Sequence, residues 1–200
     1  MKYKPEQKHS KLLNTVMICL LIAGTVAYSL PVIFRSNEIN ISPFPFTALA
    51  IMCFIAAIFL LIRYRMSSFE YIIRPRSDLD PELAAAYSVG NDISRFPYDC
   101  LDFIVYKSQS SKPGAMECVL SVSDLIAAYS LNDKKSKSEM NSKYSKDGFV
   151  FYNYTLTFRP DSVTEFIFID GNRYVGIILE DDNEVTRFLH NALENKKDEQ

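Results

Sequence analysis

The sequence predicts an α+β membrane protein in which an N-terminal transmembrane helical hairpin precedes an antiparallel β-rich domain with a C-terminal amphipathic helix. Three observations predict this fold class. Two long stretches, 12–34 and 44–62, are almost entirely apolar. Segments of aromatic and β-branched residues then recur after Phe69, as is typical of strands. Apolar residues at helical spacing finally follow Asp181.

The composition averages over these unlike parts. The chain has 200 residues, a net charge of −2 and 48% hydrophobic residues, and its mean hydropathy of −0.02 is that of a soluble protein. Much of the apolar content, however, lies in the first third. We therefore divide the chain into a basic cytoplasmic tail (1–11), a two-helix transmembrane hairpin (12–62) and a cytoplasmic domain (63–200) that is long enough for one small core. The charge predicts no nucleic-acid partner.

The two apolar stretches are long enough to cross a bilayer. Thr15–Phe34 supplies 20 residues without a charge and Phe44–Ile62 supplies 19, against roughly 20 needed for ~30 Å of hydrocarbon. A cleaved signal peptide would also explain the basic N-terminus and the small residues at 25–27. The apolar run nevertheless continues to Phe34 and a second run follows, which favours a permanent anchor.

The flanking charges predict the orientation. The loop between the stretches holds one arginine, Arg35, and one acid, Glu38. Basic residues before and after the hairpin are more numerous: Lys2, Lys4, Lys8, Lys11, Arg63, Arg65, Arg74 and Arg76. By the positive-inside rule, both termini of this multi-pass protein of the cell membrane are cytoplasmic. Neither stretch contains an ionisable Asp, Glu, Lys, Arg or His, which favours an anchor over an ion path.

The first half of the domain is predicted to contain three strands, Phe69–Ile73, Leu101–Lys107 and Met116–Val122. A short helix is expected from Asp80, as N-cap before a proline, to about Gly90. The segment Leu125–Tyr129 fits either a strand or one helical turn. The second and third strands are expected to pair as a hairpin.

The segment from Asn132 to Gly148 is the most polar of the chain and is predicted to be a mobile loop. Its basic residues are Lys134, Lys135, Lys137, Lys143 and Lys146. They could contact anionic headgroups, at about 1 kcal/mol for each basic residue near the surface. The interspersed acids favour the alternative, in which these lysines are solvated charges.

The second half is predicted to hold three further strands. Phe149–Phe158 is the strongest by composition, and its alternation places Tyr154, Leu156 and Phe158 on one face. Val163–Ile169 and Arg173–Leu179 should form a tight hairpin around Asp170-Gly171-Asn172.

The last predicted element is a helix that begins with a capping box of Asp181 and Glu184. Its apolar face consists of Val185, Phe188, Leu189, Ala192 and Leu193. This face should lie on the sheet.

The order of these elements carries a resemblance. LDFIVYK, a turn and MECVLSVSDLIAAY, together with the ending FIDGNRYVGIILEDDNEVTRFLHNAL, resemble the pattern of bacterial PH-like domains from about Phe69 to Leu193. With two spans ahead of it, the chain looks like a group of small, largely uncharacterised bacterial two-span membrane proteins. The resemblance implies a PH-like cytoplasmic domain and no catalytic residue. PH-like folds bind lipid, peptide and protein ligands alike.

No pattern for chemistry emerges. The two histidines, His9 and His190, are predicted to be surface residues without partners. The four cysteines lack metal-site spacing and are expected to be free thiols in a reducing compartment. The acidic residues 180–182 are better explained by helix capping than by cation binding. We therefore predict no catalytic, cofactor-binding or metal-binding residue, no cofactor and no enzyme.

Three functional hypotheses remain. The first is a membrane-anchored, non-enzymatic module whose cytoplasmic domain binds a protein partner or associates with itself. The second is lipid or small-ligand sensing at the cytoplasmic face through the Lys134–Lys146 segment. The third is an enzyme with an unrecognised site, which a deep pocket with converging titratable groups would favour.

Overall fold

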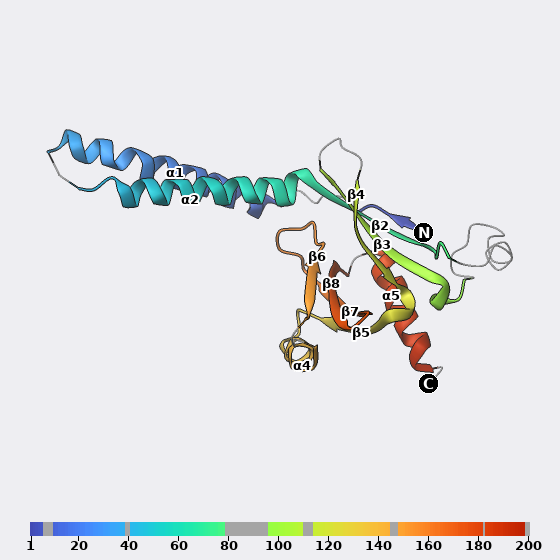
Figure 1. Cartoon of the computed structure of the whole chain (residues 1–200). Coiled ribbons are helices and arrows are strands. Elements are labelled where there is room, and N and C mark those ends of the chain that lie inside the picture. The colour runs from blue at the N-terminus through green and yellow to red at the C-terminus, as the bar shows by residue number, and fades with distance from the viewer. Residues whose placement is uncertain are drawn as a thin grey trace. The chain divides into compact units, whose positions relative to one another are not determined.

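A computed structural model describes residues 1–5, 10–38, 41–78, 96–109, 114–144, 148–181 and 183–198. The chain forms two compact units. One is the helical hairpin, Gln7–Ser67, and the other combines Met1–Glu6 with Ser68–Gln200. Figure 1 shows the elements of each unit. The helix expected around residues 80–90, His9 and Lys146 lie outside the described residues.

The hairpin unit consists of two long helices, α1 (Lys11–Ser36) and α2 (Phe44–Leu61). Ser10 caps α1 by accepting a hydrogen bond from the Leu13 amide at 3.2 Å. Both helices are long and apolar enough to cross a membrane, which confirms the two predicted helices. A π-helical turn, η1 (Ile62–Met66), extends α2.

Small residues bring α1 and α2 together, as close packing of membrane helices requires. Gly24 and Ala27 of α1 and Ala50 and Ala57 of α2 are buried. A Cβ atom added to Gly24 would lie 3.0 Å from the Phe54 ring. A larger residue at this position would therefore require the Phe54 ring to shift.

The first sheet of the domain has the strand order β1-β2-β3-β4. Its strands are β1 (Lys2–Tyr3), β2 (Ser67–Pro75), β3 (Leu101–Gln109) and β4 (Ala115–Ser121). β3 and β4 form the predicted antiparallel pair. The first residues, expected to be only a tail, include β1, which pairs antiparallel with β2. The hairpin is thus inserted between two paired strands of the domain.

The second sheet has the order β5-β7-β8-β6. Its strands are β5 (Leu125–Ser130), β6 (Val150–Asn153), β7 (Val163–Asp170) and β8 (Arg173–Glu180). The β7–β8 hairpin confirms the prediction, and Gly171 supplies the positive φ of 62° that its turn requires. The expectation of antiparallel strands throughout is wrong at one edge, because β6 runs parallel to β8.

One core joins the two sheets to the C-terminal helix α5 (Glu184–Asp198). The rings of Phe103 on β3 and Phe168 on β7 stack with centroids 6.2 Å apart. The predicted stripe of α5 enters this core, with only Phe188 partly exposed. Two single 3₁₀ turns, η3 (Tyr98–Cys100) and η4 (Val122–Asp124), precede β3 and β5.

The predicted cap of α5 is wrong. The side chain of Asn183 accepts a hydrogen bond from the Thr186 amide at 2.7 Å and so caps the helix. Asp181 instead bonds to the Ser162 hydroxyl. Asn183 lies closer to the first helical turn, which Asp181 does not reach.

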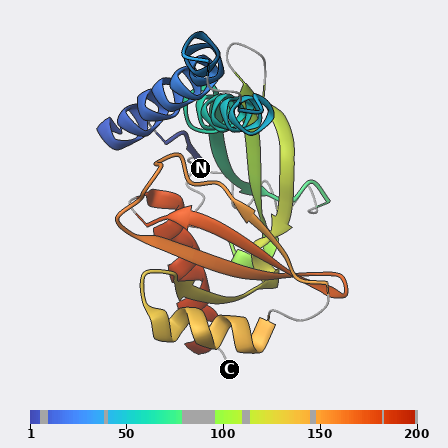
Figure 2. The same ribbon diagram turned by 90° about the vertical axis from the view of Figure 1, so that its left-hand side faces the viewer.

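The predicted loop at residues 132–148 is also wrong, because Lys134–Tyr144 forms the helix α4. Asp133 accepts hydrogen bonds from the amides of Lys135 and Ser136 at 3.1 and 3.2 Å. Met140 and Tyr144 are buried against Ile167 of β7. Since the neighbouring Phe166 and Phe168 point into the main core, α4 and α5 lie on opposite faces of the second sheet (Figure 2).

The predicted strand 149–158 is wrong beyond Asn153. The Asn153 side chain accepts hydrogen bonds from the Thr155 amide and hydroxyl at 3.0 and 2.7 Å. The Glu180 carboxylate then accepts from the amides of Leu156 and Thr157 at 2.8 and 2.7 Å. These side chains replace a partner strand, so the chain leaves the sheet while Leu156 still reaches the core.

Candidate functional site

Chemical reactivity among the described residues would depend mainly on their histidine, cysteine and acidic side chains. No group of three or more His, Cys, Asp or Glu side chains among them could hold a metal ion. His190 is not the partnerless surface residue we expected, since its ring packs edge-on against Phe166 with centroids 5.0 Å apart. The four cysteines carry free thiols. Burial raises the pKa of Cys118 to about 11, which suppresses its nucleophilic form.

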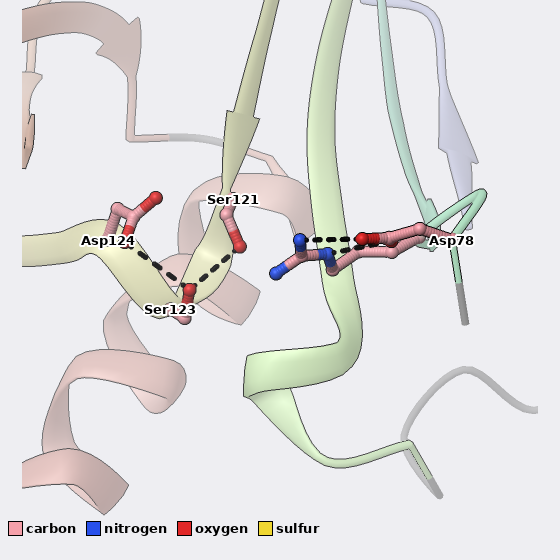
Figure 3. Close-up of polar contacts among 5 residues, drawn as sticks. Asp78, Ser121, Ser123 and Asp124 are labelled. Atoms are coloured by element: carbon pink, nitrogen blue, oxygen red, sulfur yellow. Dashed lines mark hydrogen bonds and ion pairs between the residues drawn. The ribbon is translucent and has the colours of Figure 1, made fainter. Parts of the chain in front are cut away.

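A group of polar contacts lies where the first sheet ends (Figure 3). The guanidinium of Arg76 donates two hydrogen bonds to Asp78, at 3.1 and 3.0 Å. The pKa of Asp78 is lowered by these bonds. Nearby, the hydroxyls of Ser121 and Ser123 lie 2.8 Å apart, and Ser123 donates to Asp124 at 3.4 Å.

This cluster fastens a corner of the fold. The Arg76 amide donates to the carbonyl of Cys100 at 2.9 Å. Lys196 of α5 donates to the carbonyls of Ser123 and, at 3.0 Å, Leu125. These bonds hold η4, the turn that leads the chain from the first sheet into the second. No imidazole lies among the hydrogen-bond partners of Ser121 and Ser123 in the described cluster, where Ser123 donates to the Asp124 carboxylate.

Two of the three acidic residues near the end of β8, Glu180 and Asp181, are hydrogen-bonded within the fold. The Glu180 carboxylate accepts hydrogen bonds from the amides of Leu156 and Thr157, as described above, and from the Thr157 hydroxyl at 3.0 Å. Asp181 accepts a hydrogen bond from the Ser162 hydroxyl, and Asp182 lies outside the described residues.

The strongest candidate for an interaction site is the outer edge of β6. Strand β6 ends the second sheet, with β8 on one side only. Its aromatic side chains Phe151 and Tyr152 are 64% and 38% exposed. The Tyr154 amide donates to the Ile178 carbonyl of β8 at 3.1 Å. Because ladder bonds alternate along a strand, the Phe151 amide points away from β8.

The other described edges carry the protection that natural sheets use against strand addition. Strand β4 has an irregularity in its pairing opposite Val105 and Tyr106. A salt bridge between Lys107 and Glu117, 3.6 Å long, adds charge there. Strand β1 has only two residues, and in β5 the Leu125 carbonyl already accepts a hydrogen bond from Lys196.

Sequence reasoning missed this edge. It treated Phe149–Phe158 as one strand with a buried and an exposed face. The signal was present, because aromatic residues occupy successive positions 151 and 152, and such a pair cannot both face one core.

Comparison with known proteins does not assign the chain to a family: no family model, no curated protein and no solved structure matches the chain.

Proposed function

We propose that this chain is a membrane-anchored, non-enzymatic module whose cytoplasmic, PH-like domain binds a protein partner or a second copy of itself. The exposed aromatic edge of β6 is the observation that carries the proposal. Two sheets around one core with a C-terminal helix support the PH-like description.

The placement in the membrane has two supports. Both α1 and α2 are long and apolar enough to span a bilayer, and basic residues are more numerous on the two flanks of the hairpin than in its loop. The pairing of β1 with β2 is a separate argument that the residues before and after the hairpin lie on the same side of the membrane. Because β1 and β2 pair, they must lie in the same compartment. Two crossings of the membrane by the hairpin between them give this arrangement.

Strand addition is the mode of binding that this edge favours. An incoming extended segment would pair with the outward backbone amide of Phe151, and its side chains would lie beside Phe151 and Tyr152. Aromatic residues are enriched in the centres of protein interfaces, where their burial contributes most of the affinity.

The test compares two substitutions of Phe151 in the full chain. Phe151→Pro removes both the ring and the outward amide, whereas Phe151→Ser removes the ring alone. Both should leave the free energy of unfolding nearly unchanged, since Phe151 is exposed. We expect Phe151→Pro to abolish, and Phe151→Ser to weaken, the binding of a partner or the self-association of the purified protein.

The measurements are co-purification from detergent extracts, followed by sedimentation analysis over a range of concentrations. A chain lacking residues 69–200 provides the reference without the domain. Partner binding and self-association that are the same in the wild type, the Phe151→Pro variant and the truncated chain would refute the proposal.

A further inference from the structure

We propose that the lysine-bearing surface of α4 binds the anionic headgroups of the membrane in which the chain is anchored. This surface consists of Lys134, Lys135, Lys137 and Lys143 and is distinct from the β6 edge. It concerns a different ligand from that of the proposed function and can fail independently of it.

The helix is held firmly by its inward side chains. Tyr144 packs between Tyr129 of β5 and Tyr174 of β8, with ring centroids 6.0 and 5.1 Å away. Met140 and Tyr144 are both buried against Ile167. The fold therefore presents the remaining positions of α4 as a fixed surface.

That surface is basic. All four lysines are exposed, and Glu139 is the one acidic residue between Lys134 and Tyr144. None of the four makes an ion pair within the described part of the chain, although Lys143 lies over the Tyr144 ring at 5.3 Å. Their charge is therefore available to an anionic partner, although that of Lys137 also acts on the buried Glu165 of β7.

The two lysines of the first turn are not explained by the stability of the helix, whereas Lys143 lies in the last turn, where the dipole favours a cation. Lys134 and Lys135 occupy its first turn, where the partial positive charge of the helix dipole disfavours cations. Capping is already supplied by Asp133, whose pKa these amide bonds lower. Lysines in the first turn lower the stability of the helix. We therefore attribute them to the binding of a ligand outside the helix.

Charge and tethering favour lipid as that ligand. The negative surface potential of an anionic leaflet attracts clustered lysines and decays within a Debye length. Because the hairpin connects the domain covalently to its anchor, headgroups are present at a high effective concentration. Several weak contacts would then suffice without a specific pocket.

The test uses the full chain in nanodiscs, either of phosphatidylcholine alone or with about one-third phosphatidylglycerol. Hydroxyl-radical footprinting with mass spectrometry measures the exposure of the α4 side chains and does not depend on their protonation. At low salt, we expect phosphatidylglycerol to slow modification of α4 by about threefold or more, and high salt to reverse this protection.

Two variants provide the controls. Replacing all four lysines by glutamine keeps helix propensity but removes the charge, and should abolish the lipid dependence. The control variant Lys4→Gln with Lys197→Gln removes two exposed cations elsewhere and should retain it. Equal modification in both lipids, or protection that survives the fourfold substitution, overturns the proposal. Protection by polyglutamate without protection by phosphatidylglycerol overturns it as well and indicates an acidic protein ligand.

Discussion

The ring of Tyr3 stacks on that of Tyr71 with centroids 6.3 Å apart and an interplanar angle of 18°, although the entire helical hairpin lies between them in the chain. Around this pair, Lys2 forms a 2.9 Å salt bridge with Glu70. The Ile73 amide donates to the Met1 carbonyl at 2.8 Å. The residues before the hairpin therefore belong to the same folded domain as the residues after it.

Replacing Tyr3 by alanine should destabilise the domain. Tyr3 packs against the main core, and the loss of its stacking and buried area should lower the free energy of unfolding by about 1–2 kcal/mol. Chemical denaturation of the full chain in detergent, followed by near-UV circular dichroism of the tyrosines, measures the change. Lys4→Ala, an exposed position just after β1, should have almost no effect. Equal effects of the two substitutions would show that β1 is dispensable.

Replacing Glu180 by alanine should release the segment after β6. The amides of Leu156 and Thr157 would lose a charged acceptor, at a cost of about 2 kcal/mol. Hydrogen exchange of residues 154–158 should accelerate before the rest of the domain unfolds. Glu184→Ala, an exposed acidic position at the start of α5, is the matched control. Unchanged exchange in the Glu180 variant would contradict the role assigned to this carboxylate.

The stability of the domain should depend on the protonation of Glu165, which is only 3% exposed. Around Glu165 lie its cross-strand neighbour Tyr129, Lys137 of α4 and Gly176 of β8. Because Gly176 has no side chain, the carboxylate of Glu165 fits beside it. Burial raises the pKa of Glu165 above its ordinary value of 4.5, and Lys137 only partly opposes this.

The sign of the effect follows from linkage. Because the folded pKa is the higher one, the folded state keeps a proton that the unfolded state has already lost, so stability falls as pH rises from 4.5 through the folded pKa. Glu165→Gln should remove this part of the pH dependence and be more stable than the wild type at neutral pH. Denaturation midpoints at several pH values test this; a variant less stable than the wild type at pH 7 would reverse the assignment.

Cys118 should resist alkylation in the folded protein. Its pKa of about 11, against an ordinary value of 9.0, lowers the thiolate fraction near neutral pH by about a hundredfold. Iodoacetamide labelling followed by peptide mass spectrometry should therefore show slow modification that becomes fast in denaturant. Rapid labelling without denaturant would show that the thiol is not buried as described.

The sequence predicted those elements whose pattern and packing agree. The hairpin helices, the β3–β4 and β7–β8 pairs and the apolar face of α5 all combine a clear period with burial. It failed where distant groups decide the local structure. Helix α4 has only two inward anchors, Met140 and Tyr144, whose partners lie on three different strands.

Two other failures have the same cause. The end of β6 depends on Glu180, which is distant in the chain and takes the place of a strand. Strand β1 is too short to show a period, and its partner follows the hairpin. The candidate edge of β6 became visible only with the strand order, because no local pattern indicates which strand ends a sheet.

The central claim is that the hairpin is inserted between paired strands of one domain, and a disulfide between those strands tests it most directly. Met1 and Ile73 form a hydrogen-bonded pair, so the next pair, Lys2 with Ile72, is the closer type, at about 4.5 Å between Cα atoms. This distance suits a disulfide. In membranes containing the full chain, Lys2→Cys with Ile72→Cys should form an intramolecular disulfide under mild oxidation, whereas Lys4→Cys with Ile72→Cys should not. No disulfide at the first pair, or one that links two chains, would contradict the account.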